Sequence, residues 1–186
     1  AHNGEINTIE GNRRWPQARS KVWKPPRFDI AEFDPVISMH GSDSQSLDNM
    51  LELLVAGGMD LLQALRILVP PATQSLEFKD PDLAAFYEFY GLNTEPWDGP
   101  AGIVACDGRY AACMLDRNGL RPARWLLTSD RHFLVASEAG VWELPAERIT
   151  RKGKRGPGEM MAIDLKRGDL LDSEAVDRIN RGRAPY

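Results

Sequence analysis

The chain has 186 residues, of which 42% are hydrophobic and 27% are charged, and its formal net charge at pH 7 is −4. This composition is ordinary for one globular domain with a sizeable core. The acidic balance argues against a surface that binds nucleic acid, which would normally be basic. No apolar run reaches the ~18 residues needed to span a bilayer. From the charge and the missing apolar run together, we expect neither nucleic acid nor a membrane as a partner.

The first forty residues carry few periodic signals. Trp15, Trp23 and Phe28 lie among prolines and charged residues, which predicts irregular chain packed down by its aromatic side chains. From residue 43 to residue 55, apolar residues recur at helical spacing and predict an amphipathic helix. Either Ser42 or Asp43 can serve as its N-cap.

Two further helices are predicted before residue 100. One begins at about Asp60, places a run of leucines inward and stops at Pro70-Pro71. The other begins at Asp80-Pro81, with proline at the first helical position, and ends before Gly91.

The pattern then changes to short segments, apolar or alternating, that are separated by turn residues. The predicted strands cover residues 101–106, 109–115, 123–128 and 132–137, with later candidates at 141–144 and 159–165. The basic stretch 148–155 is interrupted by glycine and followed by Gly156-Pro157, so we expect a solvated loop there. Helices followed by consecutive antiparallel strands predict an α+β fold rather than βαβ units.

Two cysteines lie in neighbouring predicted strands. A hairpin turn at Asp107-Gly108 would pair Cys106 with Arg109 and leave Cys113 too far from Cys106 for a disulfide. Both are expected to be small, buried, reduced residues, consistent with the cytosol. Since the three histidines are scattered and no Cys-x-x-Cys occurs, we expect no metal site.

Asn3-Gly4, within the run His-Asn-Gly-Glu-Ile-Asn-Thr at residues 2–8, has two interpretations. Asn-Gly is first a turn signal. It can also aim a carboxamide and a backbone N–H at one point, because glycine permits positive φ, and two such donors are what an oxyanion hole needs.

The motif is accompanied by other blocks in a fixed order. They are Gly41-Ser42-Asp43-Ser44, Glu95-Pro96-Trp97-Asp98-Gly99-Pro100-Ala101, Leu115-Asp116-Arg117-Asn118-Gly119-Leu120-Arg121-Pro122-Ala123-Arg124 and Pro157-Gly158-Glu159-Met160. Together these blocks resemble the glutaminase domain of glutamate synthases, a class II glutamine amidotransferase. The resemblance implies part of the four-layer α/β/β/α sandwich of N-terminal-nucleophile hydrolases, over residues 1–172. Residues 173–186 would then form an exit helix or a linker to a following domain.

The resemblance also implies roles for individual residues. Asn3 and Gly4 match the oxyanion-hole pair, and Asp43 matches the acid that binds the α-ammonium of glutamine. Ser42 and Gly41 flank Asp43 and are expected to shape the pocket. The family's nucleophile is an N-terminal cysteine that neither Cys106 nor Cys113 matches, so the chain as given is expected to be inactive in glutamine hydrolysis.

For the whole enzyme, the resemblance implies hydrolysis of glutamine and transfer of the ammonia to 2-oxoglutarate. It implies FMN and an iron–sulfur cluster in other domains of the same polypeptide and no cofactor in this part. The reductant would come from a reductase subunit or from ferredoxin, and the compartment would be the cytoplasm, or a plastid in a photosynthetic source. The alternatives are another class II amidotransferase, or a non-catalytic module that kept the fold.

Within the later blocks, structural roles are expected. Asn118-Gly119 turns the chain between two strands, and Arg117, Arg121 and Arg124 are expected to form structural ion pairs. Glu5 has two interpretations, an ion pair with an arginine near the site or a contact between domains.

Overall fold

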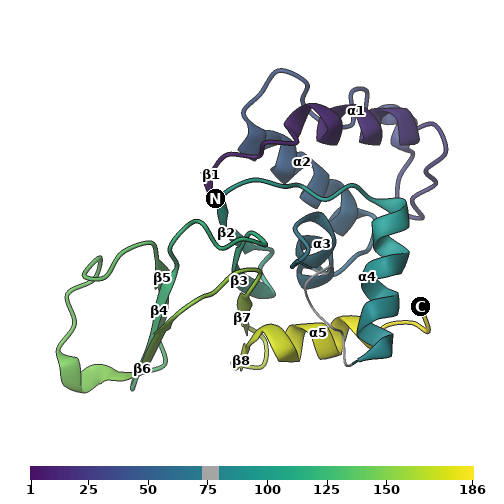
Figure 1. Ribbon diagram of the computed structural model, residues 1–186. Coiled ribbons are helices and arrows are strands. Elements are labelled where there is room, and N and C mark those ends of the chain that lie inside the picture. The colour runs from purple at the N-terminus through teal and green to yellow at the C-terminus, as the bar shows by residue number, and fades with distance from the viewer. Residues whose placement is uncertain (73–79) are drawn as a thin grey trace.

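The computed structural model describes residues 1–72 and 80–186 as helices and antiparallel strands (Figure 1). The helices are α1 (Ile9–Arg19), α2 (Asp43–Ala56), α3 (Leu61–Leu68), α4 (Pro81–Asn93) and α5 (Ser173–Arg181). The strands are β1 (His2–Gly4), β2 (Ala101–Cys106), β3 (Tyr110–Leu115), β4 (Arg124–Thr128), β5 (Phe133–Ala136), β6 (Ile149–Lys154), β7 (Met160–Asp164) and β8 (Asp169–Leu171). The prediction of an α+β fold with antiparallel strands is confirmed.

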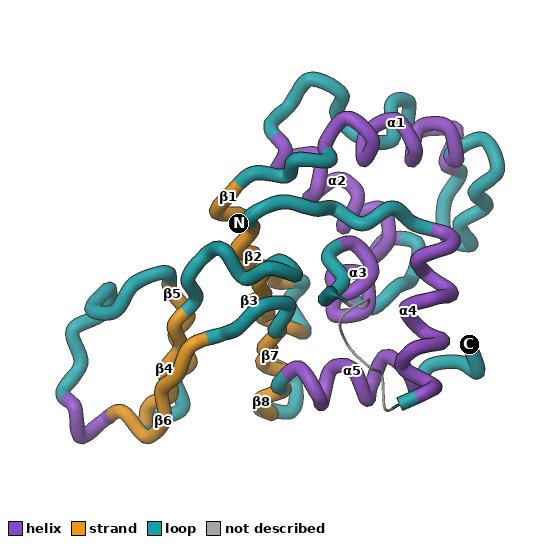
Figure 2. Tube along the Cα trace, viewed as in Figure 1, coloured by secondary structure: helices purple, strands orange, loops and turns teal. Residues whose placement is uncertain are grey.

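The strands form two sheets, whose order is β1-β2-β3-β7-β8 in one and β5-β4-β6 in the other. Figure 2 shows the helices gathered on one side of the five-stranded sheet, with the three-stranded sheet on its other side. In the described part of the chain the layers therefore run α/β/β, which is consistent with part of the four-layer sandwich.

The helices from residue 43 onward are capped as their sequences predict. Ser42 is the N-cap of α2, and its hydroxyl oxygen accepts a hydrogen bond from the N–H of Gln45 at 3.1 Å. The alternative, that Asp43 is the cap, is wrong. The side chains of Asp60 and Asp80 accept hydrogen bonds from the first turns of α3 and α4. Helix α4 continues past Gly91 to Asn93, because one glycine weakens a helix without ending it.

The prediction of irregular chain over the first forty residues is wrong for α1. The buried residues of this helix are Asn12, Arg13 and Pro16. Because the buried side of α1 carries two polar residues, its sequence has no apolar stripe to predict a helix. Strand β1 was not predicted either, since three residues are too few to show an alternating pattern.

The β2–β3 hairpin differs from its predicted register. Val104 lies opposite Cys113, and Cys106 lies opposite Ala111. The backbone N–H of Asp107 donates to the carbonyl of Tyr110. The two-residue loop of the hairpin is therefore Gly108-Arg109 rather than Asp107-Gly108. Both cysteines are free, as expected, but Cys106 is exposed, so the prediction that both are buried is wrong for Cys106.

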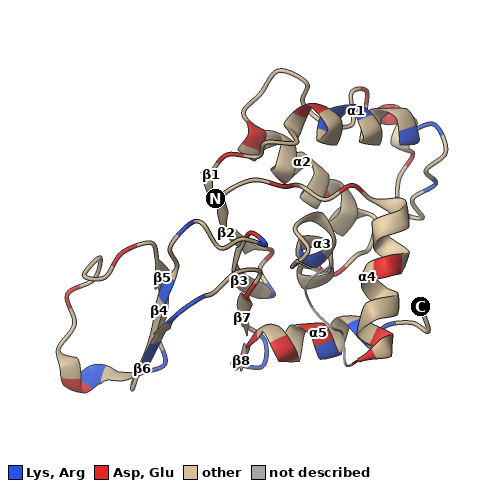
Figure 3. Ribbon diagram, in the orientation of Figure 1, with Lys and Arg blue, Asp and Glu red and all other residues tan. Residues whose placement is uncertain are grey.

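The basic stretch 148–155 is mostly strand, and the prediction of a loop there is wrong. Strand β6 pairs with β4 at one edge of the three-stranded sheet, and it carries Arg151, Lys152 and Lys154, part of the blue colouring at this strand in Figure 3. Lysine and arginine on an edge strand oppose pairing with a second sheet. No strand forms over residues 141–144, and β8 had no clear signal.

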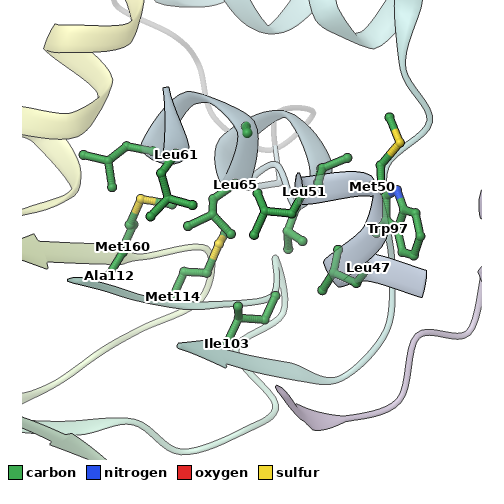
Figure 4. Packing of buried hydrophobic residues seen from close by; sticks show 14 of the residues in the cluster. Leu47, Met50, Leu51, Leu61, Leu65, Trp97, Ile103, Ala112, Met114 and Met160 are labelled. Carbon is green, nitrogen blue, oxygen red and sulfur yellow. The ribbon is translucent and has the colours of Figure 1, made fainter. Parts of the chain in front are cut away.

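The main core lies between α2, α3 and the five-stranded sheet (Figure 4). Leucines of the two helices contact Ile103, Met114 and Met160 of the sheet. A smaller apolar cluster joins the two sheets through Cys113, Trp125 and Met161. Residues 43–69 therefore anchor the N-terminus of α2 firmly against the sheet.

Helix α5 is tied to the core by a buried ion pair. The guanidinium of Arg66, which is 1% exposed, lies 3.1 Å from the carboxylate of Asp177 and also donates to the carbonyl of Gly158 at 2.6 Å. The hydroxyl of Tyr87 donates to the same carboxylate at 3.1 Å. Of the two alternatives predicted after residue 172, an exit helix or a linker, the structure has a helix, which packs on α3 and α4; its lead to a following domain stays a prediction.

This ion pair generates a stability prediction. Asp177→Ala leaves the buried guanidinium of Arg66 without its counter-charge, so the free energy of unfolding should fall by about 3–5 kcal/mol. Glu174→Ala on the same helix removes an exposed pair with Arg178 and should cost under about 0.5 kcal/mol. Denaturant unfolding of both variants measures the difference, and equal losses would contradict the assignment.

Candidate functional site

Among the residues that the structure describes, strand β1 is the edge strand of the five-stranded sheet and pairs only with β2. Ala1 exchanges two backbone hydrogen bonds with Val104, and the N–H of Glu5 donates to the carbonyl of Pro100 at 3.0 Å. In an antiparallel ladder the hydrogen-bonded residues alternate, so the N–H of Gly4 points away from β2. Within residues 1–72 and 80–186, a backbone donor is therefore left free at this edge.

Asn3 adds a second donor beside the first. Its residue is exposed, and among the residues that the structure describes nothing engages its carboxamide in a hydrogen bond. Asn3-Gly4 lies in a strand rather than a tight turn, so the interpretation of this pair as only a turn signal is wrong.

Any residue other than glycine at position 4 would force the backbone of a neighbouring segment to move. Its φ is +141°, and a Cβ built there would overlap the carbonyl oxygen of Pro100. Gly99 faces the same segment with φ +151°, and a Cβ on it would overlap the carbonyl of Glu5. The two segments 4–8 and 98–101 thus lie in closer contact than side chains allow, which requires glycine at both positions.

Asp43 comes to this segment from the first turn of α2. One carboxylate oxygen accepts the N–H of Ile6 at 2.9 Å, and the other accepts the N–H of Ser44 at 2.6 Å. Glu5 and Asn7 direct their N–H groups to residues 98–100, whereas Ile6 directs its own to Asp43. The free N–H of Gly4 is therefore on the side of the segment that faces Asp43.

The environment of Asp43 keeps it charged and accessible. Burial alone would raise the pKa of this carboxyl, but the hydrogen bonds from Ile6 and Ser44 outweigh burial and hold the pKa below its usual value. The side chain is 22% exposed. A carboxylate has about four acceptor positions, of which Ile6 and Ser44 occupy at most three. Capacity remains for a cationic group.

His2 lies beside Asp43 and was not singled out in the sequence. Its Nδ1 is 2.9 Å from the hydroxyl of Ser44 and 3.8 Å from the carboxylate of Asp43. Burial lowers the pKa of His2 below its usual value and outweighs the attraction of Asp43, so the ring is neutral at pH 7. A neutral ring can accept or donate at Ser44 but does not compete with a cationic ligand.

Gly41 and Ser42 hold the start of α2 in place. The guanidinium of Arg13 donates to the carbonyl of Gly41 at 2.5 Å and to the hydroxyl of Ser46 at 2.9 Å. A Cβ on Gly41 would overlap the side chain of Gln45. Ser42 is exposed and is the N-cap. Arg13 thus links α1 to the start of α2, where Asp43 lies, a role that no sequence signal indicated.

The cysteines do not fit the role of a nucleophile at this site. Burial raises the pKa of the Cys113 thiol to about 11, so it is protonated at neutral pH and is a poor nucleophile. Cys106 is exposed at the hairpin end of β2, at the far end of this strand from Gly4. In the described ranges no cluster of three His, Cys, Asp or Glu residues could hold a metal ion.

The remaining predicted residues have mixed outcomes. Arg117 forms the expected ion pair with Asp98, whereas Arg121 and Arg124 form none with the residues in 1–72 and 80–186. Glu5 is exposed and likewise has no ion pair with a described residue, so the expected pairing with a nearby arginine is not found within them. None of the described helices is long and apolar enough to cross a bilayer.

Comparison with known proteins shows that the chain belongs to one protein family. The family model of the class II glutamine amidotransferases matches residues 1–186. "Glutamate synthase [NADH]" of Schizosaccharomyces pombe is 45% identical over 179 residues, which is 95% of this chain and 8% of that protein. "Ferredoxin-dependent glutamate synthase 2" of Synechocystis is 42% identical and "Ferredoxin-dependent glutamate synthase 2, chloroplastic" of Arabidopsis thaliana is 41% identical, each over 190 residues, all of this chain and 12% of the relative. The chain spans about a tenth of the length of these relatives.

The close contact at Gly4 generates a second prediction. Gly4→Ala should lower the free energy of unfolding by about 1–3 kcal/mol, because a side chain at this φ is strained and collides with Pro100. Gly11→Ala is the matched control, since a Cβ at Gly11 in α1 meets nothing within 4 Å, and it should be neutral or stabilising by up to about 1 kcal/mol. Urea unfolding compares them, and a Gly4→Ala protein of unchanged stability would contradict the geometry.

Proposed function

We propose that this chain, which belongs to the class II glutamine amidotransferases, forms part of the glutaminase domain of a glutamate synthase. The observation that carries the proposal is the meeting of two segments forty residues apart. Asp43 accepts the N–H of Ile6 on the side of the segment to which Gly4 directs its free N–H. A site for a cation and a site for an oxyanion thus lie side by side, which suits an amino acid that carries an amide.

The reaction proposed is hydrolysis of the side-chain amide of glutamine. A thiolate attacks the amide carbon, the C=O electrons move to oxygen, and a tetrahedral oxyanion forms. We propose that the carboxamide of Asn3 and the N–H of Gly4 donate to this oxygen, since donors placed where charge develops lower the barrier. The oxyanion then collapses to a thioester as the C–N bond breaks, and the nitrogen takes up the proton that the thiol gave up and leaves as ammonia. Water hydrolyses the thioester, which releases glutamate and restores the thiol. The thiol would belong to another part of the polypeptide, because Cys106 and Cys113 do not fit.

Asp43 is proposed to bind the α-ammonium of glutamine. Its lowered pKa keeps the carboxyl ionised at neutral pH, and its position in the first turn of α2 favours the same charge state through the helix dipole. Ser42 and Gly41 support this role by fixing the start of α2. His2 is proposed to orient Ser44 and with it the carboxylate, since it contacts both.

The remaining steps are proposed for the rest of the polypeptide. Ammonia would pass to 2-oxoglutarate, and a two-electron reduction would give glutamate, with FMN and an iron–sulfur cluster in other domains. The electron donor would be ferredoxin, which the names of the ferredoxin-dependent relatives support, or a reductase subunit. We propose the cytoplasm as the compartment, or a plastid in a photosynthetic source, and keep residue 173 as the proposed start of the segment leading to the next domain.

The oxyanion assignment is tested in the full-length enzyme with Asn3→Ala. Because the oxyanion exists only after attack, kcat for glutamine hydrolysis should fall by about 10²–10³-fold while KM changes little. Synthesis supplied with ammonia should be spared, since ammonia bypasses this site. Asn7→Ala, an exposed asparagine of the same segment, is the control with expected wild-type rates. Unchanged hydrolysis in Asn3→Ala would sink the assignment.

The substrate-binding assignment is tested with Asp43→Asn. Loss of the charge opposite a desolvated ammonium should cost about 2–5 kcal/mol of binding, seen as a rise in KM for glutamine. Stability should fall by only about 1–2 kcal/mol, because the carboxamide keeps one of the two N–H bonds and loses the other. Asp48→Asn, on the exposed side of the same helix, should change neither quantity. A KM within threefold of wild type would show that Asp43 is structural.

A further inference from the structure

The turn that follows β3 is built around one buried carboxylate. Asp116 is 1% exposed, and its two side-chain oxygens accept the N–H groups of Ala101 and Asn118, each at 2.9 Å. Its backbone N–H donates to the carbonyl of Ala101 at 2.9 Å. Asp116 therefore binds both the donor and the acceptor of the first residue of β2.

The same turn is closed from the other side by the loop before β7. The carbonyl of Asp116 accepts the N–H of Gly119 at 2.9 Å and that of Gly158 at 2.8 Å. Gly119 has φ +62°, and a Cβ on it would press against Pro157. Every hydrogen-bonding group of Asp116 is thus engaged, so its carboxylate has little freedom to move.

Arg117 holds the neighbouring residue of the same segment. Its guanidinium lies 2.5 Å from the carboxylate of Asp98, and the Arg117 side chain is half exposed. The carbonyl of Asp98 in turn accepts the N–H of Asn7 at 2.7 Å. Two consecutive residues therefore bind the two ends of the segment 98–101: Asp116 hydrogen-bonds with Ala101, and Arg117 pairs with Asp98.

That segment is what positions Gly4. In the described part of the sheet, strand β1 has only β2 as a neighbour, and Gly4 lies opposite Ala101 in the ladder. Pro100 receives the N–H of Glu5 and lies against the Cα of Gly4. A shift of residues 98–101 would consequently move the Gly4 N–H and the Asn3 side chain together.

We propose that Asp116 and Arg117 are positioning residues for the Asn3–Gly4 oxyanion donors, acting through the segment 98–101. The inference rests on the proposed glutaminase function. Neither residue touches the substrate in this account. Their contribution is to fix the donors where the oxyanion forms, so their loss should slow hydrolysis without weakening the binding of glutamine.

Asp116→Asn in the full-length enzyme tests the inference. The substitution keeps the size of the side chain but turns an NH₂ toward one of two buried N–H groups. Since small displacements of catalytic groups cost up to about 10²-fold in rate, kcat for glutamine hydrolysis should fall about 10- to 100-fold. KM for glutamine should stay within about threefold, and ammonia-dependent synthesis should be unchanged.

Asp164→Asn is the matched control. Asp164 is 4% exposed; one of its carboxylate oxygens accepts the N–H groups of Lys166 and Arg167, and the other pairs with Arg109 at 3.5 Å. It lies opposite Tyr110, at the other end of β3 from Asp116. Asp164→Asn should lower thermal stability, because its NH₂ would face the guanidinium of Arg109, and should keep wild-type kcat. An equal fall of kcat in both variants would overturn the inference, because a general loss of stability would then explain it.

The outcomes separate this inference from the function on which it rests. Wild-type kcat in Asp116→Asn, together with a large loss in Asn3→Ala, would overturn the positioning role and leave the proposed function standing. Wild-type kcat in Asn3→Ala would overturn the oxyanion assignment and the inference with it. If Asp116→Asn does not fold, Arg117→Gln at the half-exposed pair decides. A kcat at least threefold lower with unchanged KM supports the inference, and unchanged kcat overturns it.

Discussion

The pairing of a three-residue edge strand with the first residues of β2 is the constraint on which the proposed site depends. An edge strand has a free row of backbone groups, which in most proteins is a hazard because other chains can pair with it. Here the free N–H of Gly4 is the group that the proposed chemistry needs. The same arrangement gives β1 only one neighbour, so its position is decided by the residues behind it. Glycine at positions 4 and 99 allows those segments to approach so closely.

The second half of the site depends on how α2 begins. Ser42 accepts the N–H of Gln45, which leaves the carboxylate of Asp43 for Ile6, Ser44 and the proposed ammonium group. The apolar side of α2 is packed on the sheet by Leu47 and Met50, so its N-terminus is fixed relative to β1. The hydrogen bond from Ile6 to Asp43 then joins the two halves directly. Because this bond also lowers the pKa of Asp43, the contact that assembles the site keeps its acid charged.

The sequence predicted those elements whose signal is local. Helices α2, α3 and α4 combine N-cap residues with apolar side chains, and β2 is a short apolar segment bounded by turn residues. Helix α1 could not be found, because its buried residues Asn12 and Arg13 are polar and are satisfied by partners far along the chain. Strand β6 was hidden by its basic residues. The motifs indicated Asn3, Gly4 and Asp43, but the contributions of His2 and Asp116 arise only from contacts that no spacing in the sequence reveals.

Two buried apolar side chains fix the position of the polar site. Ile6 follows Gly4 by two residues and is 2% exposed, and Trp97 precedes Asp98 and is 3% exposed. Both side chains belong to the main core. The segments that carry the polar groups of the site are therefore each anchored in the core by one apolar residue. Between the anchors the chain relies on hydrogen bonds, each of which contributes only about 1 kcal/mol. The site can therefore lose geometry through the change of one buried carboxylate while the core stays intact, which is why activity and stability should respond separately to substitutions here.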